Sequence, residues 1–130
     1  MDIIKVVCGI IYSGNKVFIC RRNANKTLAG YWEFPGGKIE KQEKPELALE
    51  RELKEELEMR VKVNEYFKTA IHKYEKFTIE LIAYKCMFID ANFRMVDHDA
   101  YEWVKIKDLK DWNLAPADIP IAVELMNFIG

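Results

Sequence analysis

Three glutamates, Glu52, Glu55 and Glu56, lie within a segment that contains no helix breaker. At about 100° per residue in a helix, they share one arc beside a stripe of leucines. Glu52 and Glu56 form a like-charge i, i+4 pair, which destabilises an isolated helix by about 0.2–0.5 kcal/mol. A hard divalent cation such as Mg²⁺ prefers oxygen ligands and would compensate this repulsion. On spacing alone, a solvated acidic face answered by neighbouring basic residues is an equal alternative.

These acids are part of a longer sequence pattern. Five residues separate Gly37 from Glu43, and seven more lead to the run Arg51-Glu52-Leu53-Lys54-Glu55-Glu56. This pattern over residues 37–59 closely resembles the signature box of the Nudix hydrolases, GX5EX7REUXEEXGU with U apolar. Glu58 stands where the family has its second glycine. Because glycine is favoured in a left-handed helix cap, this departure concerns the end of the helix and not the binding of metal.

The resemblance covers nearly the whole chain. The Gly9-Ile10-Ile11 opening, the Arg21-Arg22 pair, the run Trp32-Glu33-Phe34-Pro35-Gly36-Gly37 and the later Pro116-Ala117-Asp118 also look like MutT-type members of the family. The resemblance implies an α/β (α+β) Nudix fold, with a mixed β-sheet sandwiched between helices. It also implies a single Nudix domain over residues 1–130.

The resemblance implies hydrolysis of a nucleoside diphosphate linked to another group, with Mg²⁺ as cofactor and Mn²⁺ as a possible substitute. The catalytic residues that it implies are Glu52, Glu55 and Glu56. The metal-binding set that it implies is Gly37, through its carbonyl, with Glu52, Glu55, Glu56 and Asp97. Asp99 is the alternative to Asp97 as the metal ligand. Glu52 or Glu56 is favoured as the residue that orients or deprotonates the attacking water. Arg51 and Glu43 are expected to pair as a structural brace.

Substrate contacts are expected from several other positions. Arg22, at the end of a strand, and Lys38, after the double glycine, resemble phosphate-contacting residues. His72 is a candidate substrate contact, although a lone histidine is more often simply hydrogen-bonded. Tyr31, Trp32, Phe67, Tyr74 and Phe77 are candidates for a stacking wall, although most aromatic residues on strands are core.

Asp118 resembles the base-reading position of MutT-like enzymes, and especially of the CTP pyrophosphohydrolase subgroup. An ionised carboxylate only accepts hydrogen bonds, so it suits guanine N1–H and N2–H₂ or cytosine N4–H₂. Cytosine N3 is itself an acceptor, so bidentate pairing with cytosine needs a protonated carboxyl or a second reader, such as Glu33. The alternative for Asp118 is a helix N-cap, worth about 0.5–2 kcal/mol.

The elements that must position these residues follow from apolar and turn patterns. We expect strands at residues 3–12, 16–21, 60–74, 77–89 and 101–106, with a turn at Ser13-Gly14-Asn15. We expect helices at residues 46–57, after Pro45, and at 121–129, after Asp118-Ile119-Pro120. Strands interleaved with two helices predict a sheet with both strand directions.

Composition limits the partners. Twenty Lys and Arg against twenty-one Asp and Glu give a net charge of −1, so no basic field would hold a nucleic-acid polymer stably. Three cysteines without CxxC spacing indicate reduced core residues. No leader and no apolar run of about 18 residues is apparent, so we expect a cytoplasmic protein without membrane contact. The expected partner is a small-molecule nucleotide, and the protein is expected to be a monomer or a homodimer.

The resemblance to MutT-type members of the family implies Mg²⁺-dependent hydrolysis of nucleoside or deoxynucleoside triphosphates to the monophosphate and pyrophosphate. The expected role is sanitation of the nucleotide pool, a form of DNA repair, acting on CTP, dCTP, a modified pyrimidine or 8-oxo-dGTP. One alternative is a Nudix hydrolase of a nucleotide sugar, a dinucleoside polyphosphate or an RNA 5′ end. Another is a non-catalytic nucleotide-binding module, which the presence of all three glutamates of the helix disfavours.

Overall fold

The computed structural model describes residues 2–129. Its elements are β1 (Ile3–Ser13), β2 (Lys16–Arg22), β3 (Trp32–Glu33), β4 (Gly36–Lys38), α1 (Pro45–Leu57), β5 (Met59–Lys73), β6 (Thr78–Ala91), β7 (His98–Lys105), the 3₁₀ helix η1 (Ile106–Asp111) and α2 (Ile119–Ile129). The five predicted strands and two predicted helices are confirmed. The last strand begins earlier than predicted, and β3, β4 and η1 were not predicted. No helix within residues 2–129 is both long and apolar enough to span a membrane.

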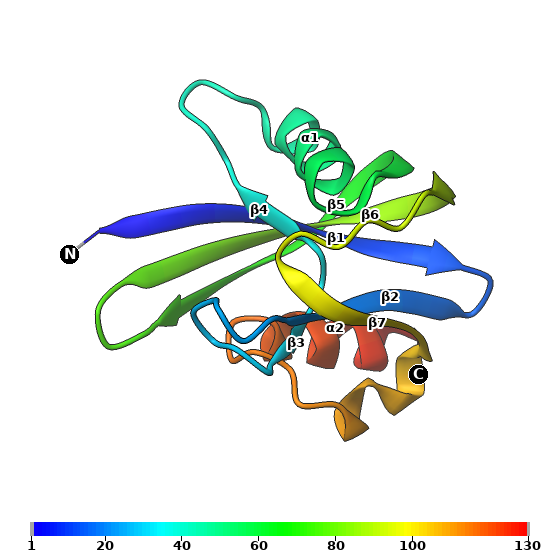
Figure 1. Cartoon of the computed structure of the whole chain (residues 1–130). Coiled ribbons are helices and arrows are strands. Elements are labelled where there is room, and N and C mark those ends of the chain that lie inside the picture. Colours follow the sequence, from blue (N-terminus) through cyan, green and yellow to red (C-terminus); the bar gives the residue numbers. More distant parts are fainter. Residues whose placement is uncertain (1, 130) are drawn as a thin grey trace.

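The sheet contains both strand directions, as predicted. Its main path is β3-β2-β1-β6-β5, with β4 paired to β1 and β7 paired to β2. β1 and β6 run parallel from the Ile3↔Thr78 pair to the Tyr12↔Met87 pair. The other ladders are antiparallel. β1 is therefore the strand around which the sheet is organised (Figure 1).

The alternation of side chains along β1 divides the core into two layers. Val7 and Ile11 pack in the cluster that contains the buried leucines of α1. Cys8 and Ile10 pack in the cluster that contains the buried residues of α2. The two helices therefore cover opposite faces of the sheet, which confirms the predicted sandwich (Figure 1). Full burial of each large apolar side chain contributes about 1.5–3 kcal/mol to this arrangement.

The sheet opens between β1 and β2. These strands pair only near their shared turn, at Tyr12↔Val17 and Ser13↔Lys16. Farther along, β4 pairs with β1 at Val6, Val7 and Cys8, and β2 pairs instead with β7. β1 and β2 therefore part where β3 and β4 enter the sheet, and polar side chains of β2, β3 and β4 meet there beside apolar side chains of β1.

The helix α1 has a first-turn proline and a left-handed end. Pro45 occupies the start of the helix, where a missing N–H costs no intrahelical bond. Glu58 ends the helix with φ 47° and ψ 45°, and its N–H donates to the carbonyl oxygen of Lys54 at 3.0 Å. This conformation is strained for a residue with a β-carbon and favours glycine.

We expect Glu58→Gly to stabilise the protein, because glycine adopts the left-handed region without steric cost. The gain should be about 0.5–1 kcal/mol after the extra entropy of glycine in the unfolded chain is subtracted. This corresponds to a rise of about 2–4 °C in Tm, measured by thermal unfolding. Glu58→Ala is the control, because it removes the same side chain and keeps the β-carbon. Equal rises in both variants would show that the backbone strain is not the cause.

Candidate functional site

A cavity of about 630 Å³ lies where β1, β2, β3 and β4 meet. Most of the residues predicted as site residues line it. These are Arg22, Glu33, Gly37, Lys38, Glu52, Glu56, Asp97 and Asp118. Two predicted site residues, Glu55 and His72, do not line it. Carboxylates, basic side chains and apolar side chains therefore line one cavity.

The double glycine of β4 allows unusually close packing. A β-carbon at Gly36 would lie 1.9 Å from the carbonyl oxygen of Val7 on β1. A β-carbon at Gly37 would lie 2.2 Å from Oε2 of Glu52 on α1. A β-carbon at Gly36 would meet the backbone of β1, so that position requires glycine, whereas a β-carbon at Gly37 would force the Glu52 side chain to move. The contact brings the backbone of Gly37 against the Glu52 carboxylate.

Arg51 braces the loop to the helix, and the predicted pair with Glu43 is confirmed. Nε of Arg51 donates to Oε2 of Glu43 at 2.8 Å, and Nη2 donates to Oε1 at 2.9 Å. Arg51 also donates to Glu52 at 3.0 Å and to the carbonyl of Lys38 at 3.1 Å. Hydrogen bonding to Arg51 lowers the pKa of Glu43 to about 2. One guanidinium thus holds the acidic helix and the glycine strand together.

Three acids at the cavity perturb one another. Burial raises the pKa of Glu56 to about 8, and the hydrogen bond to Asp97 and the charges of Asp97 and Glu52 add to the effect. The pKa of Asp97 is lowered, chiefly because its carboxylate accepts that hydrogen bond from Glu56. Burial raises the pKa of Glu52 as well. Burial and the neighbouring acids therefore favour the protonated form of Glu56, and a nearby cation would favour its carboxylate.

The donor atoms fit a hard divalent cation. Oε2 of Glu56 is buried and has no hydrogen-bond partner within the structure. Such an oxygen is costly to leave unpaired, and a cation would satisfy it. The carboxylates of Glu52, Glu56 and Asp97 supply oxygen atoms, as Mg²⁺ requires. These residues, with the carbonyl of Gly37, could hold the metal.

Asp99, the alternative to Asp97, and Glu55 do not line the cavity. Asp99 forms an ion pair with Arg21 at 2.7 Å, and both side chains are exposed. The side chain of Glu55 is 57% exposed and pairs with Arg51 at 3.2 Å. Asp97 and Arg22, and not Asp99 and Arg21, face the cavity. Placing Glu55 in the metal set would require its side chain to leave Arg51.

Asp118 lines the same cavity and is 5% exposed. Its backbone carbonyl accepts from the N–H of Ala122, which puts it at the N-cap position of α2. Its side chain, however, crosses to the adjoining segment, where Oδ2 accepts from the N–H of Phe34 at 2.9 Å. Burial raises the pKa of Asp118 well above its usual value, and the Glu33 carboxylate adds to the effect. The carboxyl therefore orders the cavity wall rather than the first turn of the helix.

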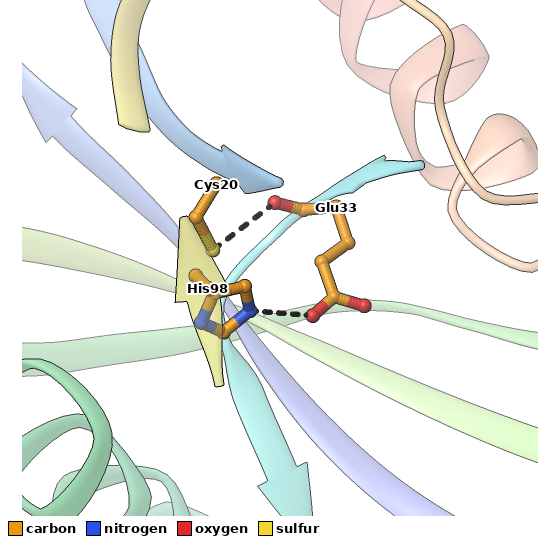
Figure 2. Close-up of side chains that lie close together, drawn as sticks. All are labelled: Cys20, Glu33 and His98. Atoms are coloured by element: carbon orange, nitrogen blue, oxygen red, sulfur yellow. Dashed lines mark hydrogen bonds and ion pairs between the residues drawn. The ribbon is translucent and has the colours of Figure 1, made fainter. Parts of the chain in front are cut away.

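Glu33 connects several polar groups beside Asp118. Its Oε2 lies 2.8 Å from Nε2 of His98, whose side chain is 3% exposed. The same oxygen accepts from Nη1 of Arg22 at 3.2 Å. Figure 2 shows the carboxylate directed at the His98 ring, with the Cys20 sulfur above it. Glu33 is therefore held in one orientation at the cavity wall.

Cys20, Glu33 and His98 also place three possible ligand atoms within 4.8 Å of one another (Figure 2). Thiol and imidazole donors suit a softer ion than Mg²⁺. The Arg22 guanidinium already neutralises Glu33, and burial raises the pKa of the Cys20 thiol well above its usual value. A cation at this position would meet an arginine and a protonated thiol. The carboxylates of Glu52, Glu56 and Asp97 therefore fit a divalent cation better than Cys20, Glu33 and His98 do.

The aromatic candidates divide into two groups. Tyr74 and Phe77 line the cavity, with ring centroids 5.2 Å apart. Trp32 packs against Trp112, and Phe67 packs against Phe128. Tyr31 does not line the cavity either. The stacking wall is therefore smaller than predicted.

His72 lies behind this wall. Its ring contacts Tyr74, with centroids 4.5 Å apart, and does not itself line the cavity. Any influence on a ligand would pass through Tyr74.

Two cavity residues were missed from the sequence as site residues. His98 was considered beside His72 as a possible metal or base contact but was not chosen, and Lys26 lies in a polar loop without a recognisable pattern. Lys26 Nζ lies 2.9 Å from Oδ1 of Asp97. Adjacency to Asp97 was the available signal for His98, whereas the fold alone brings Lys26 to the acids.

Known proteins resemble this chain over nearly its full length. Residues 6–123 match the family described as NUDIX domain. The CTP pyrophosphohydrolase of Escherichia coli strain K12 is 35% identical over 126 residues, which cover 97% of this chain and 93% of that protein. The 8-oxo-dGTP diphosphatase of the same organism is 30% identical over 126 residues, which cover 96% and 98%. The solution structure of the E. coli ORF135 protein superposes with a TM-score of 0.84 at 34% identity, covering 100% of this chain and 93% of that one.

The raised pKa of Glu56 predicts a pH-dependent stability of the metal-free protein. Between its unfolded value of 4.5 and its folded value of about 8, the folded state holds a proton that the unfolded state lacks. Stability should therefore fall as pH rises through this window. Glu56→Gln should weaken that dependence, because the amide does not ionise. Urea unfolding with a chelator at about pH 6 and about pH 9 measures the difference. Identical pH dependence in the two proteins would rule out this role for Glu56.

Proposed function

The chain belongs to the Nudix hydrolase family as a nucleoside triphosphate pyrophosphohydrolase, and from that premise we propose that it prefers CTP or dCTP and requires Mg²⁺. The observation that carries the base preference is the buried Asp118 carboxyl beside Glu33 at one end of the cavity. The similarity to a protein named CTP pyrophosphohydrolase supports the same preference.

The polar groups of Asp118 suit the pairing edge of cytosine. Burial and the neighbouring Glu33 carboxylate raise its pKa, which shifts the balance toward the neutral carboxyl. The bond from the Phe34 N–H occupies Oδ2, so Oδ1 can carry the proton toward the ligand. Cytosine N3 accepts a hydrogen bond, and N4–H₂ donates one. Asp118 would donate to N3, while the fixed carboxylate of Glu33 would accept from N4–H₂.

An oxidised guanine nucleotide is the second candidate substrate. The chain is also similar to a protein named 8-oxo-dGTP diphosphatase. Guanine presents the adjacent donors N1–H and N2–H₂, which require an ionised acceptor. Cytosine and guanine therefore demand opposite protonation states of Asp118. The raised pKa of this carboxyl favours cytosine.

The acidic end of the cavity suits the polyphosphate. We assign metal binding to Glu52, Glu56, Asp97 and the carbonyl of Gly37, with Glu55 joining only if it leaves Arg51. Bound Mg²⁺ would neutralise phosphate charge and lower the pKa of water. Lys38 lines the cavity beside Gly37 and would bind phosphate. Arg22 would contribute its remaining donors, because Glu33 and the Thr27 carbonyl hold part of its guanidinium.

Hydrolysis would proceed without a covalent protein intermediate. The water oxygen forms a bond to phosphorus in the linkage between the α- and β-phosphates, and the bridging P–O bond breaks. The products are the nucleoside monophosphate and pyrophosphate. Glu52 or Glu56 would accept the proton of the attacking water, since both carboxylates face the cavity.

The biological setting is also a proposal. We propose that residues 1–130 form a single Nudix domain with its box at 37–59, acting in the cytoplasm on free nucleotides as a monomer or homodimer. Sanitation of the nucleotide pool would make it a DNA-repair activity. The nearly neutral net charge of −1 supports free nucleotides over nucleic-acid polymers.

Glu52→Gln and Glu56→Gln should each lower kcat by about 10²-fold or more, because each removes charge and basicity from the acidic group. Both proteins should stay folded, since the substitution keeps the side-chain size. Steady-state pyrophosphate release with Mg²⁺ and dCTP measures the effect. Glu50→Gln is the matched control, because Glu50 is an exposed acid of the same helix. Wild-type rates in both cavity variants would exclude these acids from the reaction.

Asp118→Asn should keep kcat/KM for dCTP within about threefold, because an amide oxygen can face the Phe34 N–H while the NH₂ group donates to N3. Asp118→Ala should lower kcat/KM for dCTP by about 10- to 100-fold, or roughly 1.5–3 kcal/mol. The panel is CTP, dCTP, 5-methyl-dCTP, dGTP, 8-oxo-dGTP and dATP.

Thermal melts separate base reading from the support that Asp118 gives to the wall. Parallel losses for all six nucleotides in the Ala variant would remove Asp118 as a base reader. A wild type that prefers 8-oxo-dGTP, and that loses this activity in the Asn variant, would instead indicate an ionised Asp118 and a guanine substrate.

A further inference from the structure

A lysine side chain lies among the acids of the proposed metal site. Nζ of Lys26 is 2.9 Å from Oδ1 of Asp97, and the two side chains are 41% and 25% exposed. Both residues line the cavity. The positive charge of Lys26 also lowers the pKa of Glu56. The ammonium group therefore neutralises part of the charge that a divalent cation would neutralise.

The backbone around Lys26 is attached to the loop that carries Asp97. The N–H of Asn23 donates to the carbonyl of Asp97 at 3.1 Å, and its side-chain amide donates to the carbonyl of Val96 at 3.3 Å. On the other side, Nε of Arg22 donates to the carbonyl of Thr27 at 2.6 Å. These contacts keep the backbone of Lys26 at the cavity mouth while its flexible four-carbon side chain stays free to move.

A divalent cation and the ammonium group compete for the same carboxylate. Two cations close to Asp97 would repel each other, and the dication attracts the acidic group more strongly. The ammonium group would then turn from Asp97. Its backbone attachment keeps it within reach of the cavity, where a triphosphate brings several negative oxygens. A primary ammonium is a suitable point charge for phosphate.

We infer that Lys26 is a phosphate-binding residue whose ammonium group occupies Asp97 until a divalent cation takes its place. This inference rests on the proposed Mg²⁺-dependent hydrolysis of a triphosphate at the same cavity. Lys26 thereby opposes metal binding in the absence of nucleotide and favours nucleotide binding once metal is present. The two effects have opposite signs, which a purely structural role for the side chain would not produce.

The experiment measures two affinities by titration calorimetry. The first is the affinity for MgCl₂ without nucleotide, and the second is the affinity for α,β-methylene-dCTP at saturating Mg²⁺. In Lys26→Met, the Mg²⁺ affinity should rise by about two- to fivefold, the scale of losing a partly exposed competing ion pair. The affinity for the analogue should fall by about five- to twentyfold, the scale of losing a charge-assisted contact at an open site.

Two further variants identify the cause. Lys26→Arg keeps the charge, so its affinity for the analogue should stay within about threefold of the wild-type value. Lys62→Met removes an exposed lysine of β5 that does not line the cavity, so both affinities should be unchanged. Thermal melts verify that each variant is folded.

Lys26→Met with both affinities unchanged, or with both lowered, would overturn the inference while leaving the proposed function in place. Wild-type protein that binds the analogue equally well with and without Mg²⁺ would instead refute the proposed metal dependence.

Discussion

A side chain of any size at Gly36 or Gly37 would collide with β1 or α1, and the cavity depends on this close contact. The β-carbon distances, 1.9 Å to the Val7 carbonyl and 2.2 Å to Glu52, leave room only for hydrogen atoms. Because β4 lies this close, the acidic face of α1 reaches the same space as the strands that carry the basic residues. Arg51 then fixes the arrangement by joining the loop, the helix and the backbone of β4. Acids on a packed helix are held more rigidly than acids on a loop.

Burial raises the pKa of two carboxyls that line the cavity, Glu56 and Asp118, but the neighbours of the two groups differ. The raised pKa of Glu56 comes from burial and from the neighbouring acids Asp97 and Glu52, so a cation among these carboxylates would relieve their repulsion. The raised pKa of Asp118 comes from burial and from the Glu33 carboxylate, while its Oδ2 accepts from the N–H of Phe34. One cavity therefore encloses two perturbed carboxyls, one among acids and one fixed by the backbone.

The sequence was sufficient for the elements whose patterns are local. The helix Pro45–Leu57 was predicted because a first-turn proline, a leucine stripe and the absence of breakers all act within one segment. The choice between Asp97 and Asp99 could not be made locally, because an arginine of β2 pairs with Asp99 only in the folded protein. His72 contacts the ring of Tyr74 without lining the cavity, which strand alternation alone does not show, so its role as a substrate contact stays a prediction. No local sequence pattern marks Lys26 as a site residue, because only the folded chain brings it to Asp97.

The parallel ladder between β1 and β6 has a consequence for synthesis of the chain. It joins Ile3 to Thr78 and Tyr12 to Met87, so the central strand is made first and gains its main partner much later. Pairs this distant in sequence form slowly, because a long loop must close before any contact is made. Until β6 leaves the ribosome, the apolar residues Val7, Ile10 and Ile11 lack the strand that completes their layer. The hairpin of β1 and β2 therefore exposes apolar side chains in the nascent polypeptide until the later strand is made.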